Sequence, residues 1–190
     1  MESRPTIFII TGSIAAGKST VAYNFINKFD LCNVPYVSTD IYYNLFFSDF
    51  TNFDVGYNLA RLYTDRILDE YLKNRTTFVW ETVFSKSKKW DFLERCTQSD
   101  YNIISVFVVA SLETTVKRSK NRQKIGGNNV LEPFLRDRYN KSVAAISLLR
   151  QRSNMFILLN NDTNIELLLF YENGKQLYQK EVMPTWLNNY

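Results

Sequence analysis

One short segment constrains this chain more than any other feature. Residues 12–19 read Gly-Ser-Ile-Ala-Ala-Gly-Lys-Ser, which matches the phosphate-binding pattern G-x-x-x-x-G-K-[ST]. The segment follows an apolar, β-branched run at 6–11 and precedes residues 20–29, whose apolar positions recur at helical spacing. A strand, a glycine loop and a helix in this order aim backbone N–H groups and the helix N-terminus at one point, which suits a polyphosphate. The sequence therefore predicts a nucleoside triphosphate site.

Each position of this loop has an expected role. Lys18 would reach the β- and γ-phosphates of ATP, and the Ser19 hydroxyl would bind Mg²⁺. The other residues expected to surround the nucleotide are Gly12, Ser13, Ile14, Ala15, Ala16, Gly17 and Thr20. The alternative is an ordinary glycine turn before a helix. Because glycine supplies only 6 of the 190 residues, a chance match is rare.

Composition narrows the class of protein. The length suits a single domain spanning 1–190, and no apolar run approaches the roughly 18 to 20 residues of a membrane span. The first five residues lead directly into the expected first strand, so we expect no secretory signal. Cys32 and Cys96 form no metal-type pair, so neither a disulfide framework nor a zinc site is expected. These features favour a cytoplasmic protein.

The charged residues restrict the chemistry. There are 23 basic and 19 acidic side chains, a modest excess that suits anionic small molecules and is too small to argue for nucleic acid. Histidine is absent, so proton transfer must use a carboxylate, Lys, Tyr, Cys or water. The same absence excludes Ser-His-Asp and Cys-His hydrolases.

Strand-like and helix-like segments alternate along the chain. Strands are expected at 6–11, 34–39, 76–80, 101–109 and 155–159, with a hairpin at 165–171 and 176–180 around Asn173-Gly174. Helices are expected at 20–29, 54–74, 88–98, 112–122 and 133–152, and the aromatic-rich stretch 41–50 is compatible with a helix. This order predicts an α/β fold: a three-layer P-loop NTPase of the nucleotide-kinase type, with a mainly parallel sheet of about five strands, a helical lid at about 118–140 and a C-terminal β-hairpin.

Two acidic residues stand where strands are expected to end. Ligands of such sheets bind at the carboxyl ends of the strands, so Asp40, Glu81 and the phosphate loop should meet on one rim. Asp40 could accept a proton from an incoming hydroxyl, or it could only cap a helix. Glu81 could serve Mg²⁺ or the substrate together with the neighbouring Thr82, or it could be a solvated strand end.

A basic segment follows the strand at 101–109. Kinases often close an arginine-bearing lid over the transferred phosphoryl group. The candidate arginines are Arg118, Arg122, Arg136 and Arg138. The alternative is a solvated helix face or a weak nucleic-acid patch.

In their order along the chain, these motifs resemble those of the zeta toxin family, from about Pro5 to Leu177. The resemblance covers the loop and its flanks at 10–20, Ser38-Thr39-Asp40, Arg61, the segment 78–85, the lid and Leu159-Asn160-Asn161. The lid carries its most specific part: Arg118, Arg122, Gly126-Gly127, Val130, Arg136, Arg138-Tyr139 and Ser142.

The resemblance implies a small-molecule kinase. Zeta toxins use ATP and Mg²⁺ to phosphorylate the 3′-hydroxyl of the sugar in UDP-N-acetylglucosamine, and they are toxins of toxin–antitoxin pairs, so an antitoxin partner is implied. By this resemblance Asp40 is the base, Glu81 an acidic substrate-binding residue, and Arg61 and Thr82 lie on the substrate side. Arg122 with Arg136 or Arg138 would supply the lid charges, and Arg118 would face the nucleotide.

Several positions depart from the family pattern and leave the acceptor open. Asn128 stands where stand-alone members usually have a histidine, and Leu131 where they have a proline. Two other classes of function remain. One is a P-loop kinase of another acceptor, such as a nucleoside, an antibiotic or a polynucleotide 5′-end. The other is a non-catalytic nucleotide-binding protein that acts through a partner.

Overall fold

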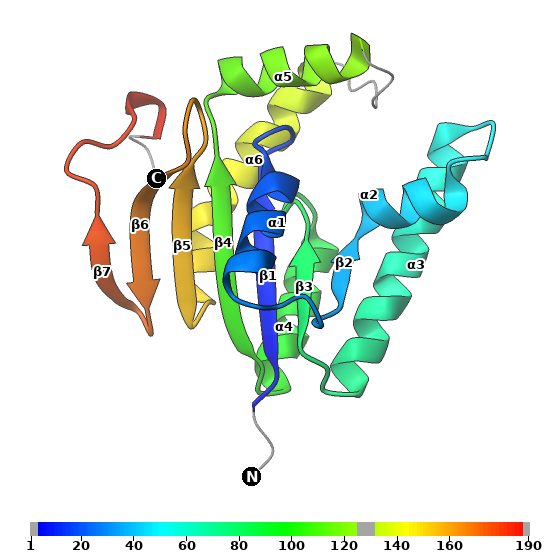
Figure 1. Cartoon of the computed structure of the whole chain (residues 1–190), viewed down its shortest axis with the longest axis horizontal. Coiled ribbons are helices and arrows are strands. Elements are labelled where there is room, and N and C mark those ends of the chain that lie inside the picture. The colour runs from blue at the N-terminus through cyan, green and yellow to red at the C-terminus, as the bar shows by residue number, and fades with distance from the viewer. Residues whose placement is uncertain (1–3, 125–131, 188–190) are drawn as a thin grey trace.

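A computed structural model describes residues 4–124 and 132–187 (Figure 1). The strands are β1 (Thr6–Gly12), β2 (Tyr36–Ser38), β3 (Phe78–Glu81), β4 (Asn102–Val109), β5 (Met155–Asn160), β6 (Glu166–Glu172) and β7 (Lys175–Gln179). The α-helices are α1 (Lys18–Lys28), α2 (Thr39–Tyr42), α3 (Phe53–Lys73), α4 (Ser87–Gln98), α5 (Leu112–Lys124) and α6 (Glu132–Gln151). A π-helical turn, η1 (Tyr43–Phe47), joins α2 to the loop before α3, and a 3-10 turn, η2, covers Thr185–Leu187.

The strands form one sheet in the order β2-β3-β1-β4-β5-β6-β7. The first five in this order are parallel, which confirms the mainly parallel core. The expected hairpin is also present, and β6 pairs antiparallel with β5, so the sheet has seven strands rather than about five. Pairing with the hairpin covers the backbone edge that β5 would otherwise leave open.

Helices cover both faces of the sheet, which makes three layers (Figure 1). Alternate residues of β1 point to opposite faces: Ile7 and Ile9 join the larger buried cluster, and Ile10 joins the smaller one. The larger cluster lies against α3, α4 and α6, and the smaller against α1. In the part of the chain that the structure describes, no helix has both the length and the apolar character to cross a membrane.

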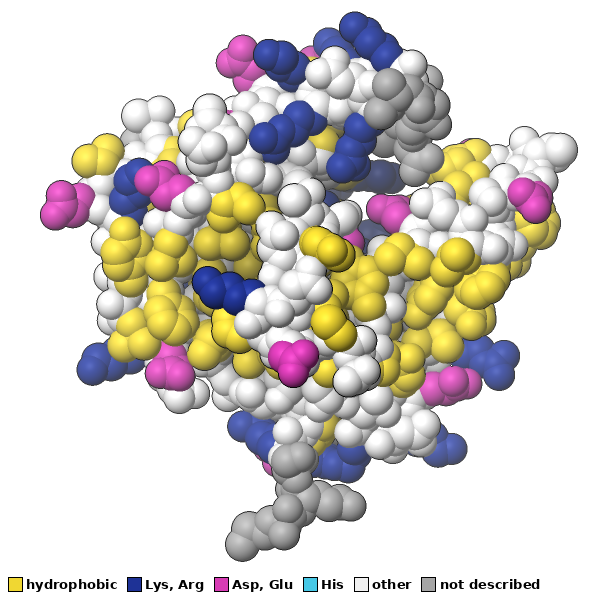
Figure 2. All heavy atoms as spheres, in the orientation of Figure 1, with side chains coloured by type: hydrophobic (Ala, Val, Ile, Leu, Met, Phe, Trp, Pro, Cys, Tyr) yellow, Lys and Arg dark blue, Asp and Glu magenta, His cyan; other side chains and the backbone are white. Residues whose placement is uncertain are grey.

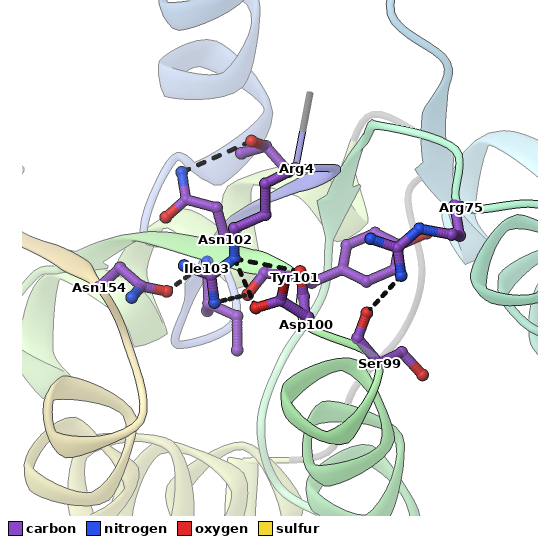
Figure 3. Close-up of polar contacts among 9 residues, drawn as sticks. Arg4, Arg75, Ser99, Asp100, Tyr101, Asn102, Ile103 and Asn154 are labelled. Carbon is purple, nitrogen blue, oxygen red and sulfur yellow. Dashed lines mark hydrogen bonds and ion pairs between the residues drawn. The ribbon is translucent and has the colours of Figure 1, made fainter. Parts of the chain in front are cut away.

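Polar contacts tie together the amino-terminal edge of the sheet, opposite the phosphate loop (Figure 3). Arg4 donates to the backbone carbonyls of Asp100 and Tyr101 at 3.0 and 3.1 Å. The Asn154 side chain accepts from the backbone N–H of Ile103 at 2.8 Å. The starts of β1, β4 and β5 are thereby held in register, while their carboxyl ends are left to form the rim on which ligands bind in such sheets.

Most expected elements are present with shifted boundaries. The hairpin turn is confirmed by positive φ angles of 48° at Asn173 and 78° at Gly174. The second strand is shorter than expected because α2 already begins at Thr39, so Asp40 lies in the first turn of a helix.

The two helices of the expected lid, α5 and α6, are both present. Ser111 caps α5 by accepting from the backbone N–H of Thr114 at 3.2 Å, and the helix runs two residues further than expected, to Lys124. The lid positions Gly126, Gly127, Asn128, Val130 and Leu131 lie outside the described residues.

Candidate active site

The phosphate loop depends on backbone conformations that favour glycine. Gly12 and Gly17 have φ angles of 143° and 93°, and Ala15 has 58°. A Cβ on Gly12 would lie 1.9 Å from the carbonyl oxygen of Val108, and one on Gly17 would lie 2.3 Å from Asn161 Nδ2. Gly12 is therefore required by its contact with the backbone of β4, and Gly17 by its positive φ angle.

The interior of the loop offers groups suited to a polyphosphate. Lys18 Nζ donates to the Ser13 carbonyl at 2.8 Å. Burial lowers the pKa of Lys18; Arg122 adds to this lowering, and Glu81 and Asp40 oppose it. The Ser13 hydroxyl is buried without a hydrogen-bond partner, and Gly17, at the N-cap of α1, has no side chain to occupy the first N–H groups of that helix. These donors fit the phosphates of a nucleotide.

A hydroxyl and a carboxylate meet beside the loop. Ser19 Oγ donates to Glu81 Oε1 at 2.9 Å, and the Tyr36 hydroxyl donates to Glu81 Oε2. Burial raises the pKa of Tyr36, and Glu81 raises it further, so Tyr36 stays a donor. Paired oxygen ligands of this kind suit Mg²⁺. Of the two roles considered for Glu81, this geometry favours the metal over the substrate.

Asp40 lies in the first turn of α2 and faces α3. Tyr57 OH donates to Asp40 Oδ1 at 2.8 Å. Burial raises the pKa of Tyr57, Asp40 raises it further, and Arg138 and Arg61 oppose the change. The N-cap of α2 is Ser38, so Asp40 is not the cap of this helix. The exposed carboxylate is thus held by one donor, Tyr57, which itself lies in electrostatic range of two arginines.

The four lid arginines have different surroundings. Arg118 Nη2 donates to the Asp162 carbonyl at 3.1 Å, in the loop after β5. Arg122 is in electrostatic range of Lys18, and Arg138 of Tyr57. Arg136 Nη2 instead pairs with Glu132 at 2.7 Å on its own helix, where it lines a groove along α5. The structure therefore directs Arg122 and Arg138, and not Arg136, toward the rim.

Two predicted side chains remain, those of Arg61 and Thr82, and sequence reasoning missed several residues near the rim. Arg61 is exposed on α3, and Thr82 accepts a hydrogen bond from Lys89 of α4. Lys89 looks like an ordinary helix-surface lysine in the sequence, and nothing there connects Tyr36 to Glu81 or Tyr57 to Asp40. Spacing rules relate neighbours within one element, whereas these pairs are 45 and 17 residues apart.

The fold and this site define the class of protein: a P-loop protein with a mainly parallel sheet, of the fold that kinases of this type share. The zeta toxin family model matches residues 1–175, and the chain belongs to the zeta toxin family. No curated protein matches the sequence.

Solved structures share the fold at low sequence identity. A chain of the AvrRxo1-ORF1:-ORF2 complex with ATP superposes with a TM-score of 0.72 at 13% identity, over 92% of this chain and 60% of that one. A chain of the PezAT toxin–antitoxin system of Streptococcus pneumoniae superposes with a TM-score of 0.64 at 10% identity, over 98% of this chain and 77% of that one. A putative kinase from Chloroflexus aurantiacus superposes with a TM-score of 0.59 at 18% identity, over 75% of this chain and 79% of that one. This chain thus spans about 60% of the length of the AvrRxo1-ORF1:-ORF2 chain that it matches.

Proposed function

We propose that the chain is an ATP- and Mg²⁺-dependent kinase that phosphorylates a hydroxyl of UDP-N-acetylglucosamine or a related acceptor. One observation carries this proposal. A phosphate loop with its lysine, a Ser19–Glu81 oxygen pair and an exposed carboxylate, Asp40, meet on one rim of the sheet, with Lys18 in electrostatic range of both acids.

The nucleotide side would be built from residues 12–20 and Arg118. The loop N–H groups and Lys18 would hold the phosphates, and Arg118, fixed to the loop after β5, would lie beside the nucleotide. Ser19 and Glu81 would hold Mg²⁺, which neutralises charge on the phosphate oxygens when it is bound.

The acceptor side would supply the base. Asp40 would accept the proton of the acceptor hydroxyl while that oxygen bonds to the γ-phosphorus, and the bond to the β–γ bridging oxygen breaks to release ADP. Arg122 and Arg138 would stabilise the charge that develops on the transferred group. Tyr57, which donates to Asp40, would hold the carboxylate in place.

The identity of the acceptor and of any partner belongs to the same proposal. Family membership supports a UDP-sugar, and Arg61 and Thr82 would contact it. An antitoxin partner is supported by the family and by the PezAT toxin–antitoxin system among the similar structures. A toxin role would follow from both.

The test is an ATP-consumption assay with Mg²⁺ and a panel of UDP-sugars, nucleosides, aminosugars and single-stranded oligonucleotides, with products identified by mass. We expect a phosphorylated UDP-N-acetylglucosamine that disappears in Asp40→Ala. Phosphorylation of another acceptor would support the kinase activity and contradict the assignment of UDP-N-acetylglucosamine as the acceptor. ATP binding without any product would contradict the kinase proposal and favour a nucleotide-binding partner protein.

A further inference from the structure

Helices α5 and α6 lie next to each other (Figure 1), and both line a groove with a volume of about 560 Å³. Residues along this α5 groove recur one helical turn apart, at Leu112, Val116, Lys120 and Lys124. At a rise of about 1.5 Å per residue, the stripe follows the axis of α5 for about 18 Å. The α5 groove is therefore an elongated channel rather than a compact pocket.

The α5 groove is separate from the candidate active site. Arg118 and Arg122 are neither of them among its lining residues. Lys117 and Lys120, which do line it, lie about 100° and about 160° around the helix axis from Arg118. Arg136, which lines the groove from α6, is the lid arginine that does not point toward the rim. A molecule in the α5 groove would therefore leave the phosphate loop accessible.

The floor of the α5 groove is aliphatic. Leu112 and Val116 stand one turn apart, and both are only partly buried. The residues that α5 buries completely against the rest of the protein are small and polar, Thr115 and Ser119. A surface helix normally turns its apolar stripe toward the core. On α5 the aliphatic pair instead faces the groove, where a further molecule could cover it.

Most of the other side chains along the α5 groove are cationic. The charged lining residues are Lys117, Lys120, Lys124, Arg136 and one acid, Glu113. Lys120 and Arg136 share a single carboxylate, that of Glu132, at 3.0 and 2.7 Å. Within residues 4–124 and 132–187, Lys117 and Lys124 form no ion pair. The groove thus combines an aliphatic floor with a surplus of positive charge.

We propose that the α5 groove binds an acidic, amphipathic helix of a partner protein. An apolar stripe on that helix would cover Leu112 and Val116, and carboxylates beside the stripe would meet the cations. The groove's length of about 18 Å corresponds to about twelve helical residues. A nucleic acid would satisfy the cations but would set its phosphates against the aliphatic floor. The inference goes beyond the proposed kinase function and does not depend on it.

The probe is a synthetic peptide of about 15 residues, with leucines at every third or fourth position and glutamates beside them. A scrambled peptide of the same composition keeps the charge and loses the apolar stripe. Fluorescence anisotropy measures the binding of both labelled peptides to the whole chain, with and without Mg²⁺ and a non-hydrolysable ATP analogue. We expect the ordered peptide to bind about tenfold more tightly than the scrambled one. The analogue should change its affinity by less than about twofold.

Three variants test the groove itself. Lys117→Glu combined with Lys124→Glu should weaken binding of the ordered peptide about tenfold, because like charges then face each other. Val116→Ser should weaken it about fivefold, because apolar area is removed from the floor. The matched control is Lys28→Glu combined with Lys73→Glu, which changes the net charge equally at exposed positions on α1 and α3. It should keep the wild-type affinity.

Several results would overturn the inference. Equal binding of the two peptides, or an equal loss in the control pair, would show only general attraction between charges. Unchanged affinity in Val116→Ser would remove the aliphatic floor from the interface, and no measurable binding of the ordered peptide would remove the interface altogether. Displacement of the peptide by the ATP analogue would place it at the phosphate loop instead.

A single-stranded oligonucleotide of similar length tests the other class of partner. If it binds more tightly than the ordered peptide, and loses that affinity in the Lys117→Glu and Lys124→Glu pair, the groove is a nucleic-acid site and the inference is wrong. Failure of the chain to bind the ATP analogue would contradict the proposed function alone, because peptide binding is also measured without the analogue.

Discussion

The two halves of the candidate site are built in different ways. The nucleotide side comes almost entirely from one continuous segment, residues 12–20, whose shape is set by backbone dihedral angles and by close contact with β4. The acceptor side is assembled from α2, α3, the end of β3, α4 and α6. Its groups are side chains, such as Asp40, Tyr57 and Lys89, held by single hydrogen bonds or pairs of them.

The surroundings of the two halves differ as well. Most residues of the segment 12–16 are buried, whereas the acceptor side borders a partly exposed aromatic cluster on η1 and α3 (Figure 2). Tyr57 packs against Phe53 and Tyr43, with ring centroids 5.4 and 5.7 Å apart. Gly56 lets α3 approach η1, since a Cβ there would lie 2.5 Å from the Phe47 carbonyl oxygen. Acceptor preference can therefore change through substitution of single side chains, whereas a substitution at Gly12 would have to move the backbone of the loop or of β4.

The largest expected effects separate the halves by function. Asp40→Ala should lower turnover about 10²- to 10⁴-fold, the range for general acid–base catalysis, with ATP affinity nearly unchanged. Lys18→Ala should weaken ATP binding itself, because it removes the charge that reaches the phosphates. Calorimetric ATP binding beside steady-state kinetics measures both. Equal loss of ATP affinity in the two variants would erase the distinction.

The claim that the backbone shapes the loop is tested by paired glycine substitutions. Gly12→Ala should destabilise the fold by at least about 3 kcal/mol, because the new Cβ meets a backbone carbonyl and the φ angle is unfavourable. Gly174→Ala is the control. Its Cβ would meet nothing within 4 Å, so only the positive φ angle costs energy, about 1 kcal/mol. Urea unfolding measures both; similar losses would argue against steric control at Gly12.

On the acceptor side, Tyr57→Phe should lower turnover about tenfold, because Tyr57 donates to Asp40 and the variant leaves the carboxylate without that donor to orient it. Tyr63→Phe, on the same helix, is the matched control. Steady-state kinetics measures both variants, and unchanged turnover in Tyr57→Phe would show that Tyr57 packs beside Asp40 without positioning it.

The lid arginines offer a smaller contrast within one helix. Arg138→Ala should reduce turnover about tenfold, since Arg138 faces the rim. Arg136→Ala should stay within about twofold, because its exposed ion pair with Glu132 is of a kind that contributes little. Initial-rate kinetics at saturating ATP decides the assignment, and a larger effect at Arg136 would reverse it.

The last expected effect concerns the pH dependence of stability. The pKa of Lys89 is lowered from 10.5 to about 7, so between these pH values the unfolded chain holds a proton that the folded chain releases. The free energy of unfolding should therefore gain a favourable contribution as pH rises from about 7 toward 10. This slope should be smaller in Lys89→Met than in the wild type or in Lys88→Met, as measured by urea unfolding across that range.

Much of the fold was predictable because its signals are local. The strand–loop–helix order around Gly12–Ser19, the long buried run of β4 and the Asn173-Gly174 turn each reflect preferences of neighbouring residues. The rim was predictable from a general rule about parallel sheets. The strand count was not, because pairing of the hairpin with β5 depends on which backbone edge is open.

The candidate site shows the same distinction between local signals and contacts formed on folding. By itself, the sequence determined the family, the phosphate loop and the exclusion of histidine from proton transfer, because motif spacing and the absence of histidine are properties of the chain. Only the tertiary structure decided that Glu81 meets Ser19, that Tyr57 holds Asp40, that Arg138 rather than Arg136 faces the rim and that Lys89 lies beside Thr82. Those relations join elements far apart in the chain, and they exist only after the helices pack on the sheet.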